Sequence, residues 1–414
     1  MMRKLAIVLS LILLFSLTAL GLDPRSNPAL IQWDQHLLLF MNADADVSIR
    51  QNLITVEDWN NFFDGATITF DESRMNILAG DLTALLPLNA YADAGIRIGN
   101  IRLGLDVFTE SKFAFSMPSE IVDLLFEGIT VGEHYASGTF LEGWTTVGAG
   151  VIAGLNLGRI KLGANVSAFI PLINVVESDL EFSYNSSTET ASVEANLSAY
   201  TRILSAVDPF NLEAELENIR NDFQTFVNEY AGIKLDIGIA YGDKYPLWGV
   251  GVRNITLKPG KALYAFEANA NAAVTATLPS VEDATYTYDY SVASSTLTEP
   301  EESSIPMEFT GFLTFPMGLI NLTLNGSYSP GSASSSDSYA IEATAWLPWK
   351  LLPISLSYGY ESSGYYRKAA SIGLNLHFIS ILLEGYVVSK QPLDLDPSLT
   401  PLSGGVSLRF SLGI

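Results

Sequence analysis

The chain has 414 residues, 48% of them hydrophobic, a formal net charge of −23 and no cysteine. This acidity argues against nucleic acid and anionic lipid headgroups as ligands, and the lack of cysteine excludes disulfides and thiol chemistry. The three histidines, His36, His134 and His377, are too scattered to predict a zinc site.

The N-terminus has the pattern of an export signal. Arg3 and Lys4 precede an apolar run over residues 5–17, and Ala19-Leu20-Gly21 offers a small-x-small cleavage site. The run is shorter than the ~20 residues of a membrane helix, and an uncleaved anchor is the alternative. We predict a signal peptide over residues 1–21, cleaved near Gly21. Removing its two cations takes the charge of the chain from −23 to −25.

A first strand is expected to start near His36, after an irregular stretch that contains two prolines. Odd-numbered residues from Ala43 to Ile49 are apolar and the even-numbered residues between them are polar, so the two kinds lie on opposite faces. Asp44 and Asp46 have the spacing of a calcium loop, but a strand without a bending glycine cannot wrap an ion. We predict that both carboxylates face a polar interior.

Residues 51–86 have a mixed pattern. We predict short helices at Val56–Phe63 and Asn76–Leu86, around a strand at Ala66–Phe70. In the β-barrel that the strands described below predict, these helices would lie in an extracellular loop or fold into the lumen. Farther on, Ser192–Ile203 is predicted to be a strand. A helix is then expected from Asp208-Pro209 to Tyr230. That helix has one apolar and one acidic face, so it is either a plug or gate or a simple cover over one barrel mouth.

Regular hairpins follow the mixed region. Residues 98–104 and 157–163 have nearly the same sequence, in which apolar and polar residues alternate on both sides of Gly99-Asn100 and Gly158-Arg159. Glycine favours two-residue turns because it tolerates positive φ. Outer-membrane barrels keep their short turns on the periplasmic side, so we predict that both turns lie there.

Alternation continues to the C-terminus, where every second residue from Val406 to Ile414 is apolar. Strands with one apolar and one polar face, in an exported chain, are typical of a barrel in the outer membrane. We predict an all-β fold, a single transmembrane antiparallel β-barrel over residues 36–414. It should have about 14–16 strands, with 16 as the best count, and short helices in the loops or lumen. The C-terminal strand is expected to engage the barrel-assembly machinery.

The polar positions of these strands define the expected lumen lining. Its predicted members are Asp44, Asp46, Arg97, Arg102, Asp106, Lys161, Lys234, Asp236, Glu267, His377 and Arg409. Mixed charges either cross-link a lumen or line a water-filled pore, and the sequence leaves both open. No histidine has a nucleophile motif around it, no spacing singles out a carboxylate pair, and no phosphate loop occurs. We therefore predict no catalytic, cofactor or metal site.

Asn27-Pro28-Ala29, located between the signal and the first strand, resembles the motif of FadL-type long-chain fatty-acid transporters and the related TraF/PorV-like barrels. The resemblance implies about fourteen strands, with the N-terminal segment, residues 22–35 here, in the lumen and hydrophobic cargo passing it. FadL-type proteins carry a substantial hatch before this motif, whereas only residues 22–26 precede it here. A helix at Pro118–Glu127, with Leu124, Leu125 and Phe126 as a hydrophobic gate, is a candidate replacement, as is the helix that ends at Tyr230.

The expected function is passive transport of small or hydrophobic solutes, without covalent chemistry. The alternative is a structural or accessory barrel with a closed lumen that serves envelope integrity, adhesion or secretion. The expected partners are the bilayer of the outer membrane, the assembly machinery and the solute. The sequence leaves the oligomeric state open.

Overall fold

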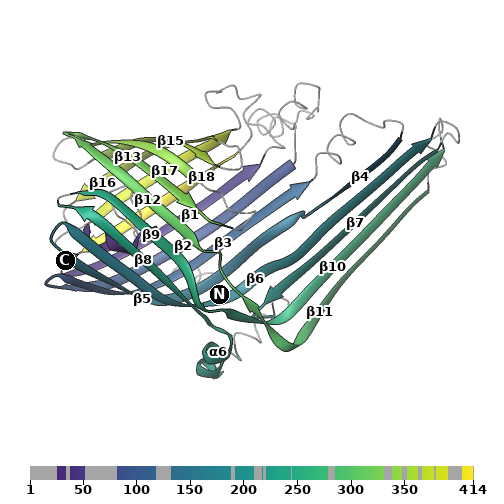
Figure 1. Cartoon of the computed structure of the whole chain (residues 1–414), viewed down its shortest axis with the longest axis horizontal. Helices are drawn as coiled ribbons and strands as arrows, with labels where there is room; N and C mark the ends of the chain where they lie inside the picture. The colour runs from purple at the N-terminus through teal and green to yellow at the C-terminus, as the bar shows by residue number, and fades with distance from the viewer. Residues whose placement is uncertain are drawn as a thin grey trace, which may run out of the picture.

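The computed structural model describes residues 26–33, 38–51, 82–117, 132–187, 192–208, 217, 221–243, 245–277, 285–330, 338–346, 352–361, 366–376, 379–389 and 403–413. Over these ranges the chain is almost entirely antiparallel sheet, with eighteen strands, one α-helix and one short 3-10 helix. Fourteen strands close into a barrel, and four more lie outside it (Figure 1).

The barrel closes because β18 (Gly404–Gly413) pairs with β1 (Leu39–Gln51), as in the pair of Ala43 and Phe410. The remaining barrel strands, in pairing order, are β2 (Leu82–Ile98), β3 (Ile101–Met117), β5 (Leu141–Leu157), β6 (Ile160–Ser187), β8 (Gly232–Gly242), β9 (Pro246–Lys258), β12 (Glu308–Met317), β13 (Ile320–Tyr328), β14 (Ser338–Trp346), β15 (Pro353–Glu361), β16 (Tyr366–Leu376) and β17 (Ile379–Ser389). The predicted antiparallel barrel is therefore confirmed, but the best count of sixteen strands is wrong.

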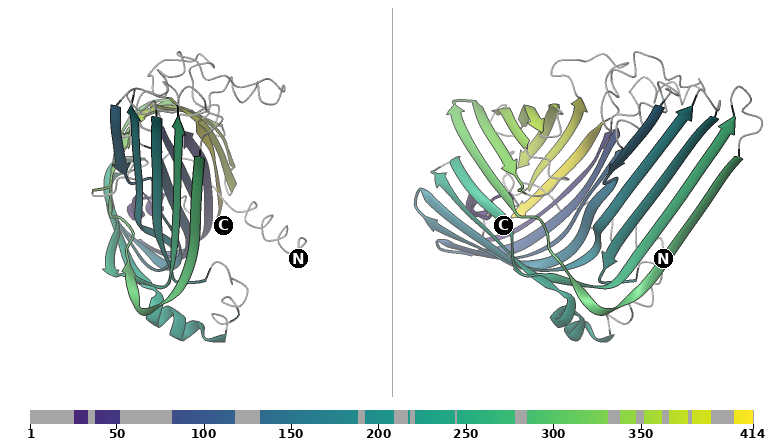
Figure 2. Two further views of the ribbon diagram at one scale, coloured as in Figure 1. Left: turned by 90° about the vertical axis from the view of Figure 1, so that its right-hand side faces the viewer. Right: turned by 45° about the vertical axis from the view of Figure 1, so that its right-hand side comes forward.

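The surplus strands form a second sheet, which we call the wing. It consists of β4 (Gly132–Gly138), the second half of β6, β7 (Ser192–Ser205), β10 (Gly260–Thr277) and β11 (Thr285–Ser303), paired in that order. The prediction of a strand at Ser192–Ile203 is confirmed, but this strand lies in the wing and not in the barrel wall. Figures 1 and 2 show that the wing leaves the barrel rim as one broad blade.

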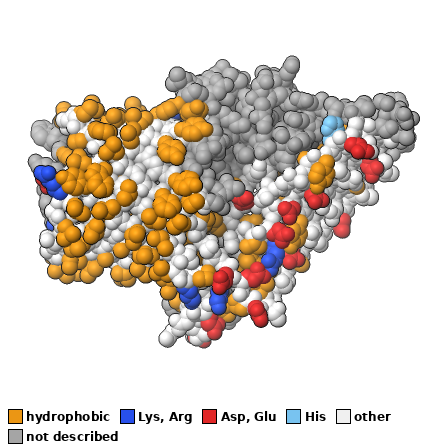
Figure 3. All heavy atoms as spheres, viewed as in Figure 1, with side chains coloured by type: hydrophobic (Ala, Val, Ile, Leu, Met, Phe, Trp, Pro, Cys, Tyr) orange, Lys and Arg blue, Asp and Glu red, His pale blue; other side chains and the backbone are white. Residues whose placement is uncertain are grey.

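The barrel wall is apolar outside and polar inside. On β3, Leu103, Leu105 and Val107 are 43%, 68% and 55% exposed, whereas Arg102 and Asp106 between and beside them are 0% and 2% exposed. Exposed hydrophobic side chains cover the barrel surface in Figure 3. This is the distribution expected for a wall whose outer face contacts acyl chains.

Short turns gather at one end of the barrel. Gly99, Gly158 and Gly318 have φ values of 60°, 76° and 73° there, a backbone region that glycine enters at little cost. The two predicted hairpins have the expected register, because Ile98 pairs with Ile101 and Leu157 with Ile160. The wing extends the strands at the opposite end, since the second half of β6 lies farthest from its turn.

Several predicted elements need correction or fall outside the described residues. A helix over Asn76–Leu86 is wrong for its last five residues, because β2 begins at Leu82 and pairs with Met117 of the long β3. The segments 1–21, 52–81 and 118–131 are not described, which includes the predicted signal peptide and the gate residues Leu124, Leu125 and Phe126.

The single described α-helix is α6 (Phe223–Tyr230), which ends where the sequence predicted. Its N-cap is Asp222, whose Oδ1 accepts a hydrogen bond from the Thr225 N–H at 3.3 Å. The predicted start at Asp208-Pro209 adjoins residues that are not described. None of the described helices has both the length and the apolar character needed to cross a bilayer.

Candidate functional site

The N-terminal segment lies inside the barrel as a short 3-10 helix, η1 (Pro28–Trp33), preceded by Asn27. Asn27 is 1% exposed. Its Nδ2 donates to the backbone oxygens of Ile239 and Val250 at 3.1 and 3.0 Å, and its Oδ1 accepts from the Ala29 N–H at 3.0 Å. The side chain therefore ties the segment to two neighbouring strands, β8 and β9.

Glycines on the inner face of the wall make room for this segment. A Cβ atom on Gly163, Gly238 or Gly251 would fall less than 3.0 Å from backbone atoms of Pro28, the side chain of Asn27 or the carbonyl oxygen of Ser26. These three glycines belong to the neighbouring strands β6, β8 and β9. We call them the glycine cradle. The close approach requires residues without a side chain.

The segment also contacts strands farther along the wall. The guanidinium of Arg102 on β3 donates to the backbone oxygen of Ile31, and the Ile31 side chain packs against Phe40 and Ile152. The hydroxyl of Thr310 on β12 donates to the backbone oxygen of Ser26. The segment therefore links β3 with β12, which are not neighbours in the sheet.

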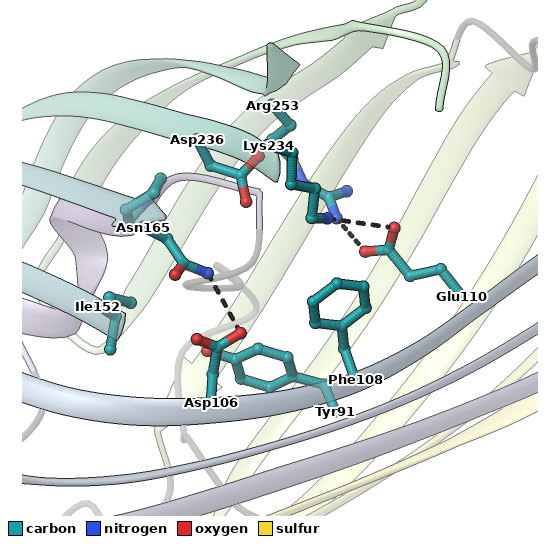
Figure 4. Close-up of a pocket in the computed structure, with 10 residues that line it drawn as sticks. Tyr91, Asp106, Phe108, Glu110, Ile152, Asn165, Lys234, Asp236 and Arg253 are labelled. Carbon is teal, nitrogen blue, oxygen red and sulfur yellow. Dashed lines mark hydrogen bonds and ion pairs between the residues drawn. The ribbon is translucent and has the colours of Figure 1, made fainter. Parts of the chain in front are cut away.

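A charged cluster lies next to η1, since Pro28 lines the same cavity (Figure 4). Glu110 of β3 pairs with Arg253 of β9 at 2.6 Å and with Lys234 of β8 at 3.5 Å. Strands β5, β6 and β8 separate β3 from β9 in the sheet. These contacts thus cross the lumen, and we call them the lumen latch.

An irregularity in the wall holds the cationic side of the latch. Asn254 has a φ of +57° where the register between β8 and β9 shifts, and its N–H donates to Asp236 at 2.6 Å. Lys234 donates to Asn254 Oδ1 at 2.9 Å and lies 4.2 Å from the ring centre of Phe108. A bulge of this kind redirects side chains into a site.

The latch leaves little free space. The cavity between Asp106, Asn165, Lys234 and their neighbours measures about 10 Å³, which is the room for one water molecule. An apolar layer of Phe108, Phe169 and Ile305 lies beside it, with Tyr91 and Trp144 packed against this layer. The described side chains therefore nearly fill this cavity.

The opposite wall carries its own charged pairs. Arg409 of β18 contacts Asp44 of β1 at 2.9 Å, directly across the strand pair that closes the barrel. Arg367 pairs with Glu384 and stacks on Tyr386. These bonds join neighbouring strands, so they stiffen the wall without crossing the lumen.

The predicted lumen residues divide between these places. Lys234, Asp236 and Asp106 meet in the charged cluster, and Arg102 holds η1. Lys161 donates to Asn156 and to the carbonyl of Gly158, and Arg97 donates to Gly99, so both lie at the short turns. Asp46 is partly exposed on β1, and His377 is outside the described residues.

The predicted lumen lining is wrong for two carboxylates, Glu267 and Glu110. Glu267, predicted to line the lumen, instead lies on the wing 3.6 Å from Arg202, because its strand continues past the rim. Glu110 was missed, although it shares the even-numbered face of β3 with Arg102 and Asp106. Extending the alternation four residues beyond Asp106 would have found it. Among the described residues, no group of three or more His, Asp or Glu side chains is arranged to hold a metal ion.

No protein-family profile and no curated protein sequence matches the chain. Similar solved structures include the Ralstonia pickettii toluene transporter TbuX, with 9% identity over 94% of this chain and 92% of that one and a TM-score of 0.43. The P. putida toluene transporter TodX has 8% identity over 94% and 93% of the two chains, with a TM-score of 0.43. A TodX deltaS2S3 mutant, described as a monoaromatic hydrocarbon channel, has 8% identity over 97% and 96%, with a TM-score of 0.48. With identities below 10% and TM-scores below 0.5, these likenesses carry no argument about the family or the function of this chain.

Proposed function

We propose that this protein is an outer-membrane β-barrel that serves as a passive channel for small or hydrophobic solutes. The observation that carries the proposal is the Asn27-anchored segment, which occupies a polar lumen inside a barrel with an apolar exterior. An apolar exterior on a closed barrel requires a bilayer, and polar residues inside suit an aqueous path. The short-turn end then faces the periplasm and the wing faces outward.

The segment is well suited to leave the lumen without damage to the barrel. The described residues of the segment pair with no strand, and their polar contacts with the wall include two hydrogen bonds from Asn27 and one each from Arg102 and Thr310. A neutral bond of this kind contributes about 0.5–1.5 kcal/mol, and the bond from the charged Arg102 about 1.5–3 kcal/mol. The apolar layer of Phe108, Phe169 and Ile305 would then offer an adjoining surface to a hydrophobic solute.

A second function, the closed accessory barrel, is favoured by the lumen latch. Glu110 contacts both Lys234 and Arg253 across the lumen, and the remaining cavity holds about one water molecule. A barrel built only for strength would keep such a cross-link permanently. The two functions differ in whether the obstruction ever opens.

Single-channel recording in planar bilayers separates these functions. The proteins to compare are the wild type, Asn27→Ala, Glu110→Gln and the double variant, with Asn271→Ala in the exposed wing as the matched control. We expect rare openings for the wild type and for the control, and frequent openings for the double variant. Silence of all variants, in protein that retains the heat-resistant electrophoretic mobility of a folded barrel, would establish the accessory function instead.

Binding of laurate and of toluene to detergent-solubilised protein tests the hydrophobic part of the proposal. We expect Phe169→Ser, inside the barrel, to weaken binding by about tenfold, the effect of removing a buried aromatic contact of about 1.4 kcal/mol. Phe315→Ser is the control, because Phe315 is 46% exposed on the outer face. Equal affinity of all three proteins would remove the apolar layer from the path.

A further inference from the structure

The wing has two chemically different faces. Residues paired across its five strands share a face, and one such row contains Tyr135, Ser183, Asn196, Ala273 and Thr287. The next row on the same face contains Glu181, Ser198, Asn271 and Asp289. The opposite face carries alanines and the tyrosines at 286, 288 and 290, each 74% exposed. The sheet therefore has one polar face and one apolar face, and both belong to the same strands.

A groove of about 300 Å³ runs along the polar rows. All nine of those residues line it, together with Phe182, Leu197, Ala272 and Tyr288 from the alternate positions of the same strands. Its floor is low because serine and alanine occupy the middle strands, as at Ser183, Ser198 and Ala273. The rows on either side hold longer side chains, with Glu133 and Glu194 in one and Tyr200 in the other. The groove thus crosses the strands, and it is bounded by taller residues along both sides.

The lining groups are those that recognise hydroxyl-rich molecules. Carboxylates, amides and hydroxyls each accept hydrogen bonds, and the amides and hydroxyls also donate them. Ser198 donates to Asn271 Oδ1 at 2.8 Å, which leaves the Asn271 Nδ2 as a donor for a ligand acceptor. Tyr135 is 62% exposed at one end and presents an aromatic face. An aromatic ring packs well against the C–H face of a sugar ring.

We propose that this groove binds a linear, uncharged oligosaccharide. Five strands spaced about 4.8 Å apart span roughly 19 Å, which is long enough for several sugar units. The carboxylates Glu181 and Asp289, with Glu133 and Glu194 beside the groove, repel anionic sugars. Such a surface site is separate from the lumen, so its ligand need not be the transported solute. Acidic grooves also attract basic peptides, and the test includes that partner.

The site can be tested on the full-length barrel in a sugar-free detergent such as lauryldimethylamine oxide. Saturation-transfer NMR would compare maltotriose, cellotriose and N-acetylchitotriose with trigalacturonate and with trilysine. We expect at least one neutral trisaccharide to bind, with affinity lowered about tenfold or more by Tyr135→Ala and by Asp289→Ala. Tyr290→Ala, on the opposite face, should bind as the wild type does.

Three outcomes would overturn the proposal. The first is the absence of any signal from neutral trisaccharides at about 10 mM, a concentration that detects even weak sites. The second is binding that both groove substitutions leave unchanged. The third is preferential binding of trilysine that salt reverses, which would indicate a basic protein partner. Heat-resistant mobility of each variant confirms that the barrel is folded, and a failure here leaves the channel proposal unaffected.

Discussion

The barrel wall and the wing are built from the same alternating strands, but they present them to different surroundings. In the wall, Leu105 is 68% exposed and Arg102 is fully buried. In the wing, the tyrosines of β11 and the polar groove are both accessible, and Tyr290 is 74% exposed. Alternation specifies two faces, and closure of the sheet decides which face meets water.

The charged pairs follow the same division. Lys234 and Glu110 of the lumen latch have side chains only 3% and 13% exposed, whereas Arg202 and Glu301 of the wing are 24% and 39% exposed. Hydrogen bonding to Glu301 is the main cause that raises the pKa of Arg202, which therefore stays charged at any ordinary pH. Burial makes an ion pair costly to break, whereas solvent weakens an exposed one.

Removing one partner from each pair should give the largest contrast. Glu110→Ala takes the carboxylate away from the buried Lys234, whereas Arg253 keeps its pair with Glu308 at 2.9 Å. We expect a loss of about 3 kcal/mol in unfolding free energy, which comes mainly from Lys234. Glu301→Ala in the wing should lower it by less than about 1 kcal/mol. Urea unfolding in phospholipid vesicles measures both. Equal losses would mean that water screens the latch as well as it screens the wing.

Charges placed on the two exposed apolar surfaces should give the next contrast. Leu105→Arg introduces a cation on the outer wall and should destabilise the barrel by about 2–4 kcal/mol if the residue lies near the bilayer midplane. Val292→Arg, at a position 63% exposed on the wing, should change stability by less than about 0.5 kcal/mol. The same unfolding assay applies. A large effect at Val292 would place the wing against lipid.

The sequence predicted the wall well and the wing poorly, for a physical reason. Alternation identified the outer face of β3, the hairpins at Gly99 and Gly158 and the antiparallel fold, because these follow from local pattern and turn chemistry. The number of barrel strands was wrong because β7 and β10 alternate just as wall strands do. Only the pairing of each strand with its neighbours distinguishes wing strands from wall strands, and strand pairing cannot be read from a local stretch of sequence.

The lumen contacts were predicted only in part for a similar reason. Alternation indicated that Lys234 and Asp236 face inward. No local pattern reveals that Glu110 of β3 reaches Lys234 of β8 across the two intervening strands, β5 and β6. The glycine cradle was equally hidden. A glycine at 163 has the appearance of a weak strand residue until the Pro28 backbone is found against it.

The cradle offers a third contrast, between two glycines of the same wall. Gly163→Ala forces a Cβ against Pro28, whereas Gly385→Ala points into open space. We expect the first to cost about 1–3 kcal/mol through overpacking or to displace η1, and the second to have little effect. Maleimide labelling of a Leu30→Cys variant, in a chain without other cysteines, reports displacement. Equal labelling rates in both glycine variants would mean that the segment shifts without being released.

The smallest expected effect concerns α6, which lies at the elbow where the wing meets the barrel (Figure 2). It contacts both regions, since it packs near β10 of the wing, and Lys258 at the end of barrel strand β9 donates to the carbonyl of Asn228 at 3.0 Å. The pKa of Tyr230 is raised, mainly because the side chain is partly buried. This burial agrees with a helix that packs against the sheet. Asp222→Ala removes the N-cap and should destabilise the helix by about 0.5–1 kcal/mol.

Hydrogen exchange locates that loss. If α6 is an independent cover, exchange should quicken at the Phe226 and Ala231 amides, which donate to Asp222 and Val227, and nowhere in the barrel or wing. Gln224→Ala, an exposed change to a better helix former on the same helix, is the control and should slow exchange or leave it unchanged. Faster exchange throughout β10 would instead show that α6 stabilises the wing, because destabilising the eight-residue helix would then destabilise the five-stranded sheet as well.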